Sequence, residues 1–83
     1  MKILPASELV LKKVSKYNLS KKFKKQLLLL ARDFYHPGLN CELLEPKKMG
    51  LYSFRLDRKF RAIFIFREKE KLIEVLNITI HYR

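Results

Sequence analysis

Three side chains in the second half of the chain, Arg55, Arg61 and His81, are of the types that bind a phosphate and transfer a proton. A guanidinium group holds a phosphate through a bidentate pair of hydrogen bonds, and an imidazole exchanges a proton near neutral pH. If short turns join consecutive strands, Arg55 lies opposite Arg61, and His81 lies near them on the same face. Two arginines across a strand pair repel each other by up to about 1 kcal/mol, which favours an anion between them. The spacing leaves an alternative equally open, in which each arginine forms a local salt bridge with Asp57 or Glu42.

Other residues near this face have weaker claims to chemistry. Glu42 is a possible proton acceptor, although a lone carboxylate in a loop is usually just solvated. Tyr82 has the parity of the core, but a strand end frays, so its ring is also free to stack on a base. His36 precedes a proline and is expected to cap or pack. Cys41 is the one cysteine, so it is expected to be a reduced, partly buried thiol, and neither a metal nor a cofactor is predicted.

The composition limits the class of protein. With 83 residues, 48% of them hydrophobic, the chain is expected to form one domain over residues 1–83. A net charge of +11 indicates a polyanionic partner, such as nucleic acid or an acidic protein. The only glycines, Gly38 and Gly50, exclude a glycine-rich phosphate loop. No apolar run is long enough to span a bilayer and no signal peptide is visible, so a cytoplasmic protein that does not bind membranes is expected.

Two helices are predicted in the first part of the chain. Ser7 and Ser20 are candidate N-caps, Asn18 is expected to end the first helix, and residues 36–38 end the second. Many lysines lie beside the apolar stripe of the second helix, where they are expected to form ordinary helix surface and also suit non-specific contacts with a polyanion. The basic residues assigned to RNA binding are Lys21, Lys22, Lys24, Lys25, Lys47, Lys48 and Arg83.

Three segments rich in aromatic and branched residues predict an antiparallel meander: 51–57, 59–67 and 72–82. Residues 1–4 are expected to form a short strand, and residues 41–44 an irregular one. Strand parity assigns the even positions to the core, with Glu74 as an exception at a frayed end. This core set is Tyr52, Phe54, Leu56, Phe60, Ala62, Phe64, Phe66, Leu72, Leu76, Ile78 and Ile80. The predicted class is α+β, with two N-terminal helices packed on one face of a small antiparallel sheet.

The order of elements and several short motifs resemble one family over nearly the whole chain. These motifs are His-Pro-Gly-Leu at 36–39, Leu-Tyr-Ser-Phe-Arg-Leu at 51–56, Phe-Arg-Ala-Ile-Phe at 60–64 and Ile-His-Tyr at 80–82. The pattern is similar to that of the RelE/ParE toxin superfamily of prokaryotic type II toxin–antitoxin systems. The resemblance implies a RelE-like microbial RNase fold.

The C-terminal His-Tyr pair places the resemblance nearest to the YoeB-like branch, whose members are ribosome-dependent mRNA endonucleases. The resemblance implies that Arg61 stabilises the transition state with help from Arg55, and that His81 transfers a proton. Glu42 would be the base, and Tyr82 would stack on or orient the substrate. The chain lacks the Gly-Lys-Pro-Glu-Pro-Leu stretch typical of that branch, and one further residue follows its His-Tyr pair.

The resemblance also implies partners: a cognate acidic antitoxin that covers the basic site, the ribosome, and mRNA. Any oligomer would form only through the antitoxin complex. Two other functions stay open at this point. One is gyrase inhibition of the ParE type, in which His81 and Tyr82 are incidental. The other is a catalytically inactive basic module that binds RNA or the antitoxin.

Overall fold

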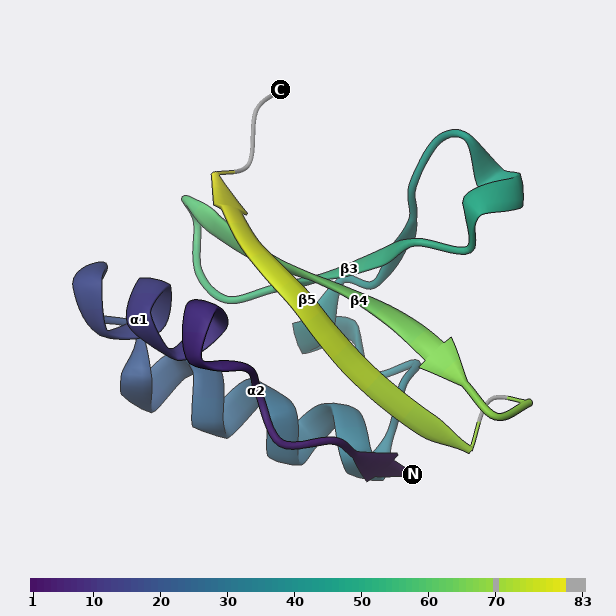
Figure 1. The fold of residues 1–83 in the computed structure, drawn as a ribbon, viewed down its shortest axis with the longest axis horizontal. Helices are drawn as coiled ribbons and strands as arrows, with labels where there is room; N and C mark the ends of the chain where they lie inside the picture. The colour runs from purple at the N-terminus through teal and green to yellow at the C-terminus, as the bar shows by residue number, and fades with distance from the viewer. Residues whose placement is uncertain (70, 81–83) are drawn as a thin grey trace.

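The structure is a computed structural model that describes residues 1–69 and 71–80. Two helices lie side by side on one face of a twisted sheet (Figure 1). In chain order the elements are β1 (Lys2–Ile3), α1 (Glu8–Lys16), α2 (Ser20–Arg32), the 3₁₀ turn η1 (Pro37–Leu39), β2 (Glu42–Leu43), the 3₁₀ turn η2 (Lys47–Met49), β3 (Tyr52–Arg55), β4 (Phe60–Arg67) and β5 (Leu72–Ile80). The predicted α+β class with helices on one face is confirmed.

The sheet has five strands in the order β1-β5-β4-β3-β2. The meander of β3, β4 and β5 is antiparallel as predicted, and β2 adds to it antiparallel. β1, however, runs parallel to β5, pairing Lys2 with Leu72, and the N–H of Leu4 extends the pairing to the carbonyl of Ile73 at 2.8 Å. The sheet is therefore mixed and not wholly antiparallel, because α1 and α2 carry the chain back across the sheet between β1 and the meander.

The core lies between the helices and the covered face of the sheet. α1 and α2 contribute Val10, Val14, Phe23 and Leu30, all of which are buried. The sheet contributes Phe54, Ala62 and Phe64, which are 0% exposed. Because an aromatic or branched side chain contributes about 1.5–3 kcal/mol when fully buried, this layer holds the helices against the sheet.

The ends of α1 agree with the caps predicted from the sequence, whereas the start of α2 does not. Ser7 caps α1 through a hydrogen bond from the N–H of Val10 at 3.2 Å, as predicted. Asn18 ends α1 in the left-handed conformation (φ 59°), and Leu19 donates its N–H to the carbonyl of Val14, which is the Schellman arrangement. Ser20 is not the N-cap of α2, contrary to expectation, because Leu19 already accepts the first helical bond, from Phe23.

A β-bulge in β5 corrects the predicted core. Ile63 pairs with Asn77 but Phe64 pairs with Val75, so Leu76 is an extra residue. Before the bulge the odd residues Ile73 and Val75 face the core, whereas Leu72 and Leu76, assigned to it, are only half-buried. The same shift explains Glu74, which lies opposite Ile65 and pairs with Arg67. Ile80, also assigned to the core, is 38% exposed at the end of β5.

Candidate functional site

Arg61 on β4 is the one charged side chain among the buried residues of the described chain, with only 4% of its surface exposed. Its Nε donates to Ser53 Oγ at 2.8 Å. Its Nη2 donates to the carbonyl of Ser53 at 3.3 Å and to the carbonyl of Asn40. All three acceptors are neutral, so they fix the direction of the guanidinium group without neutralising its charge.

The sequence assigned no role to Ser53 and Asn40, the two residues that hold Arg61. Ser53 lies on β3, where it pairs with Glu42 on one side and Ile63 on the other. Asn40 follows η1 with a positive φ of 45°, a conformation in which asparagine is enriched. The turn sequence Pro-Gly-Leu-Asn signals that conformation, but it does not say which donor the carbonyl of Asn40 accepts.

The electrostatic environment of Arg61 is mixed. Burial lowers the pKa of its guanidinium group, the charges of Glu42 and Cys41 raise it, and the charge of Arg55 lowers it. Glu42 is therefore close enough to interact with Arg61, yet the ion pairs within residues 1–69 and 71–80 join other residues. Arg61 thus keeps a positive charge that no described carboxylate neutralises by direct contact.

A hollow of about 240 Å³ opens beside the guanidinium group of Arg61. Glu42 and Leu44 line it from the β2 segment, Ser53 from β3, and Thr79 and Ile80 from the end of β5. The predicted proximity of Glu42, Arg61 and the end of β5 is thereby confirmed. The walls combine a cation, a carboxylate and two hydroxyl groups, which is a suitable set for holding a phosphate and moving a proton.

Arg55 lies directly opposite Arg61 across β3 and β4, as the strand parity predicted. Thr79 is the residue opposite Arg61 on β5. Arg55 is exposed, and it lines a different hollow from the one beside Arg61. The two arginines are therefore neighbours in the sheet, but only Arg61 is fixed by buried acceptors.

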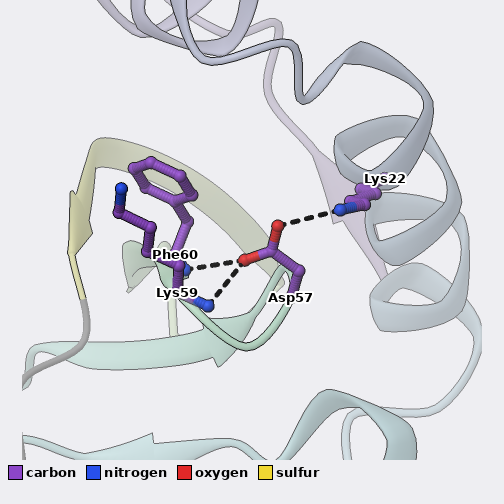
Figure 2. Close-up of polar contacts among 4 residues, drawn as sticks. All are labelled: Lys22, Asp57, Lys59 and Phe60. Carbon is purple, nitrogen blue, oxygen red and sulfur yellow. Dashed lines mark hydrogen bonds and ion pairs between the residues drawn. The ribbon is translucent and has the colours of Figure 1, made fainter.

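Asp57, considered above as a salt-bridge partner of the arginines, pairs with Lys22 instead. Asp57 accepts a hydrogen bond from Lys22 Nζ at 2.9 Å, and its other oxygen accepts from the backbone N–H of Lys59 and of Phe60, both at 2.8 Å (Figure 2). Burial opposes ionisation of this carboxyl, but the bonds from Lys22, Phe60 and Lys59 lower the pKa of Asp57 overall. Asp57 is thereby occupied by donors other than Arg55 and Arg61.

His81, Tyr82 and Arg83 lie outside the described residues, so their assigned roles stay predictions. The described part of β5 ends at Ile80, which lines the hollow beside Arg61.

The lysines assigned to RNA binding lie on the surface of two elements. Lys21, Lys22, Lys24 and Lys25 are exposed on α2, and Lys47 and Lys48 are exposed on η2. They are not gathered around Arg61, and only Lys22 and Lys25 line the hollow that Arg55 also lines.

His36 and Cys41 have structural roles near the site. His36 Nδ1 accepts the N–H of Gly38 at 2.9 Å and so caps η1, as expected. Burial raises the pKa of the Cys41 thiol to about 11, although the positive charge of Arg61 opposes this. Cys41 is therefore a protonated thiol at neutral pH and a poor nucleophile.

No helix in residues 1–69 and 71–80 combines the length and the apolar content needed to cross a lipid bilayer. In the same residues, no three His, Cys, Asp or Glu side chains gather in a way that could hold a metal ion.

The sequence matches no protein-family model and no curated protein. The fold, in contrast, is similar to a solved structure, the YoeB/ParE toxin from Agrobacterium tumefaciens, with a TM-score of 0.76. The match covers 99% of this chain and 100% of that toxin chain, at 16% sequence identity. The fold that the resemblance implied is thus confirmed.

Proposed function

We propose that this protein is the toxin of a type II toxin–antitoxin system and acts in the cytoplasm as a ribosome-dependent mRNA endonuclease. An acidic antitoxin would neutralise it by covering the basic surface, and any oligomer would form through that complex. The fold shared with a YoeB/ParE toxin and the net charge of +11 support this proposal. The name YoeB/ParE includes both branches of the superfamily, so the choice of RNA cleavage over gyrase inhibition depends on the site.

The observation that carries the choice is the buried charge of Arg61. A buried cation without an ion-pair partner is costly unless another group compensates it, and the acceptors of Arg61 are neutral. An anion entering the adjacent hollow would compensate that charge. The hollow is small and Glu42 also lines it. These features support a site for one scissile phosphate rather than a broad surface that attracts anions.

In the proposed reaction, the 2′-hydroxyl of the RNA attacks the adjacent phosphorus and the bond from phosphorus to the 5′-oxygen breaks. Glu42 removes the proton from the 2′-hydroxyl, and His81 gives a proton to the departing 5′-oxygen. Arg61, assisted by Arg55, stabilises the negative charge of the phosphorane-like transition state, and Tyr82 stacks on or orients a base. Because the acceptors of Arg61 already fix its direction, little reorganisation is needed in the transition state.

The alternative functions predict different outcomes at the same residues. A gyrase inhibitor of the ParE type would block supercoiling without cutting mRNA, and a catalytically inactive module would bind RNA or the antitoxin without toxicity. In neither case would His81 affect RNA cleavage.

The test is in vitro translation followed by primer extension, with Arg61→Lys and His81→Ala variants. Arg61→Lys keeps a charge but loses the guanidinium fork, so we expect cleavage to fall about 10²–10³-fold. Arg67→Lys is the matched control, because Arg67 lies on the same strand, is exposed and pairs with Glu74. Circular dichroism establishes that each variant folds. Undiminished cleavage by both folded variants, or supercoiling inhibition without mRNA cuts by the wild type, would refute the proposal.

A further inference from the structure

A second hollow, of about 470 Å³, lies between α2, η1 and the end of β3. Lys22 and Lys25 line it from α2, His36 from the residue before η1, and Arg55 and Asp57 from the end of β3 and the turn that follows. It shares no lining residue with the hollow beside Arg61. Of its lining residues only Arg55 takes part in the proposed reaction, so the hollow itself has no explanation there.

Gln26 builds the wall of this hollow. The residue is 8% exposed, and its Nε2 donates to the carbonyl of Gly38 at 3.1 Å and to the carbonyl of Arg55 at 2.7 Å. The amide therefore ties three elements together and holds the end of β3 at a fixed distance from α2. His36 is also oriented, because its Nδ1 accepts the N–H of Gly38, which leaves the proton on Nε2 when the ring is neutral.

The charges around the hollow do not cancel. Lys22, Lys25 and Arg55 are cations, and among the described residues Asp57 is the one carboxylate that lines it. Both oxygens of Asp57 are occupied, one by Lys22 and one by two backbone N–H groups (Figure 2). Lys25 and Arg55 make no ion pair within the described residues, so the lining of the hollow includes two basic residues that no described carboxylate pairs with.

This arrangement is unfavourable for α2 as an isolated helix. The first turn has no acidic residue, and lysines stand where the helix dipole is positive. A cation near the N-terminal end of a helix is unfavourable, and like charges three or four residues apart repel each other. Lys22 and Lys25 form such a pair. A bound anion would offset both the unfavourable interaction with the helix dipole and the repulsion between the lysines.

We propose that the hollow between α2 and β3 is a second phosphate-binding site for single-stranded RNA, next to the site of cleavage. Arg55 connects the two hollows, because it lines this one and pairs across the sheet with Arg61, which lines the other. A phosphate here contacts Lys25 and Arg55, and the Nε2–H of His36 donates to a phosphate or ribose oxygen. The choice of RNA as the ligand rests on the proposed function, but binding at this hollow does not require cleavage.

The experiment measures binding of a fluorescently labelled oligouridylate to the full chain by anisotropy, at several salt concentrations. Lys25→Gln is the test variant, and Lys12→Gln, an exposed lysine on α1, is the matched control. We expect Lys25→Gln to weaken binding severalfold and to reduce the slope of log affinity against log salt by about 0.7, the value for one phosphate contact on a single strand. Asp57→Asn removes the one opposing charge, and we expect it to tighten binding.

Two results would overturn this site. The first is an equal loss of affinity in Lys25→Gln and Lys12→Gln, which would show that only total charge matters. The second is an oligoglutamate peptide that competes for the oligouridylate and has the same dependence on Lys25, because the site would then recognise an acidic protein. Arg61→Lys separates this proposal from the proposed function: if that variant still cleaves mRNA, the catalytic assignment fails, while the comparison of Lys25 with Lys12 is unaffected.

Discussion

Asp57 connects the turn between β3 and β4 to α2, and replacing it by alanine should measurably destabilise the fold. The carboxylate accepts the backbone N–H of Lys59 and of Phe60 within the turn, and the ammonium group of Lys22 from the helix. Asp57→Ala removes all three bonds. Asp57→Asn keeps an oxygen acceptor for the turn but removes the charge.

The magnitude follows from the exposure of each partner. The side chains of Lys22 and Asp57 are 55% and 22% exposed, so their ion pair contributes only about 0.2–1 kcal/mol. Lys59 is exposed, and water can replace the bond to its N–H. Phe60 is 7% exposed, and leaving its N–H without a partner costs about 1–3 kcal/mol. We therefore expect Asp57→Ala to lower the free energy of unfolding by about 2 kcal/mol, and Asp57→Asn by less than about 1 kcal/mol.

The same carboxylate makes stability depend on pH. Because the pKa of Asp57 in the folded state lies below its ordinary value of 3.8, the folded state favours the ionised form. This contribution is fully present above the unfolded pKa and is lost as the pH falls through the folded pKa. Between pH 5 and pH 2 the wild type should therefore lose more stability than Asp57→Asn.

Thermal and urea unfolding followed by circular dichroism would measure these differences. For a domain of this size, about 2 kcal/mol corresponds to a fall in Tm of roughly 8–16 °C. Lys22→Ala is the companion variant, and it should cost no more than the ion pair. If Lys22→Ala is as destabilising as Asp57→Ala, the ion pair and not the turn dominates, and the reasoning from exposure is wrong.

Two further predictions concern a thiol and a helix end. Because the pKa of Cys41 is about 11, iodoacetamide at pH 8 should alkylate the folded protein roughly two orders of magnitude more slowly than free cysteine. Denaturant should remove the difference. An equal rate in the folded state would contradict the raised pKa. Asn18 has a φ of 59°, so Asn18→Val should lower the free energy of unfolding by about 1–2 kcal/mol. Asn18→Gly should change it by only a few tenths of a kcal/mol, because glycine adopts this conformation readily. Equal urea midpoints for the two variants would argue against a left-handed residue at the end of α1.

Local patterns predicted the elements because each pattern depends on residues close in sequence. Ser7 and Asn18 lie within a few residues of the backbone groups that they influence, and both roles were correct. Parity also placed Arg55 opposite Arg61, since a short turn joins β3 to β4. It failed in the first part of β5, because Val75, Leu76 and Ile78 are all apolar and the pattern does not reveal which of them is the extra residue.

The candidate site was harder to predict, because its details depend on contacts between distant residues. The polarity of the alternate face identified Arg61, but nothing local shows that the carbonyl of Asn40 and the hydroxyl of Ser53 hold it in a buried position. The partner of Asp57 was also unexpected, because Lys22 lies on a helix far away in sequence. Charge counting located the lysines on α2 but did not distinguish Lys25, beside the second hollow, from Lys21, which lies elsewhere on the helix.

The parallel pairing of β1 with β5 has a consequence for folding kinetics. Lys2 and Leu72 are about 70 residues apart, so bringing them together closes a loop at an entropic cost of roughly 4 kcal/mol before any constant term. β1 offers only a two-residue strand in return, so its pairing should form late, after the hairpin of β4 and β5 is in place. Substitutions in β1 should then accelerate unfolding while leaving the folding rate nearly unchanged, and amide hydrogens at this edge of the sheet should exchange before those of β4.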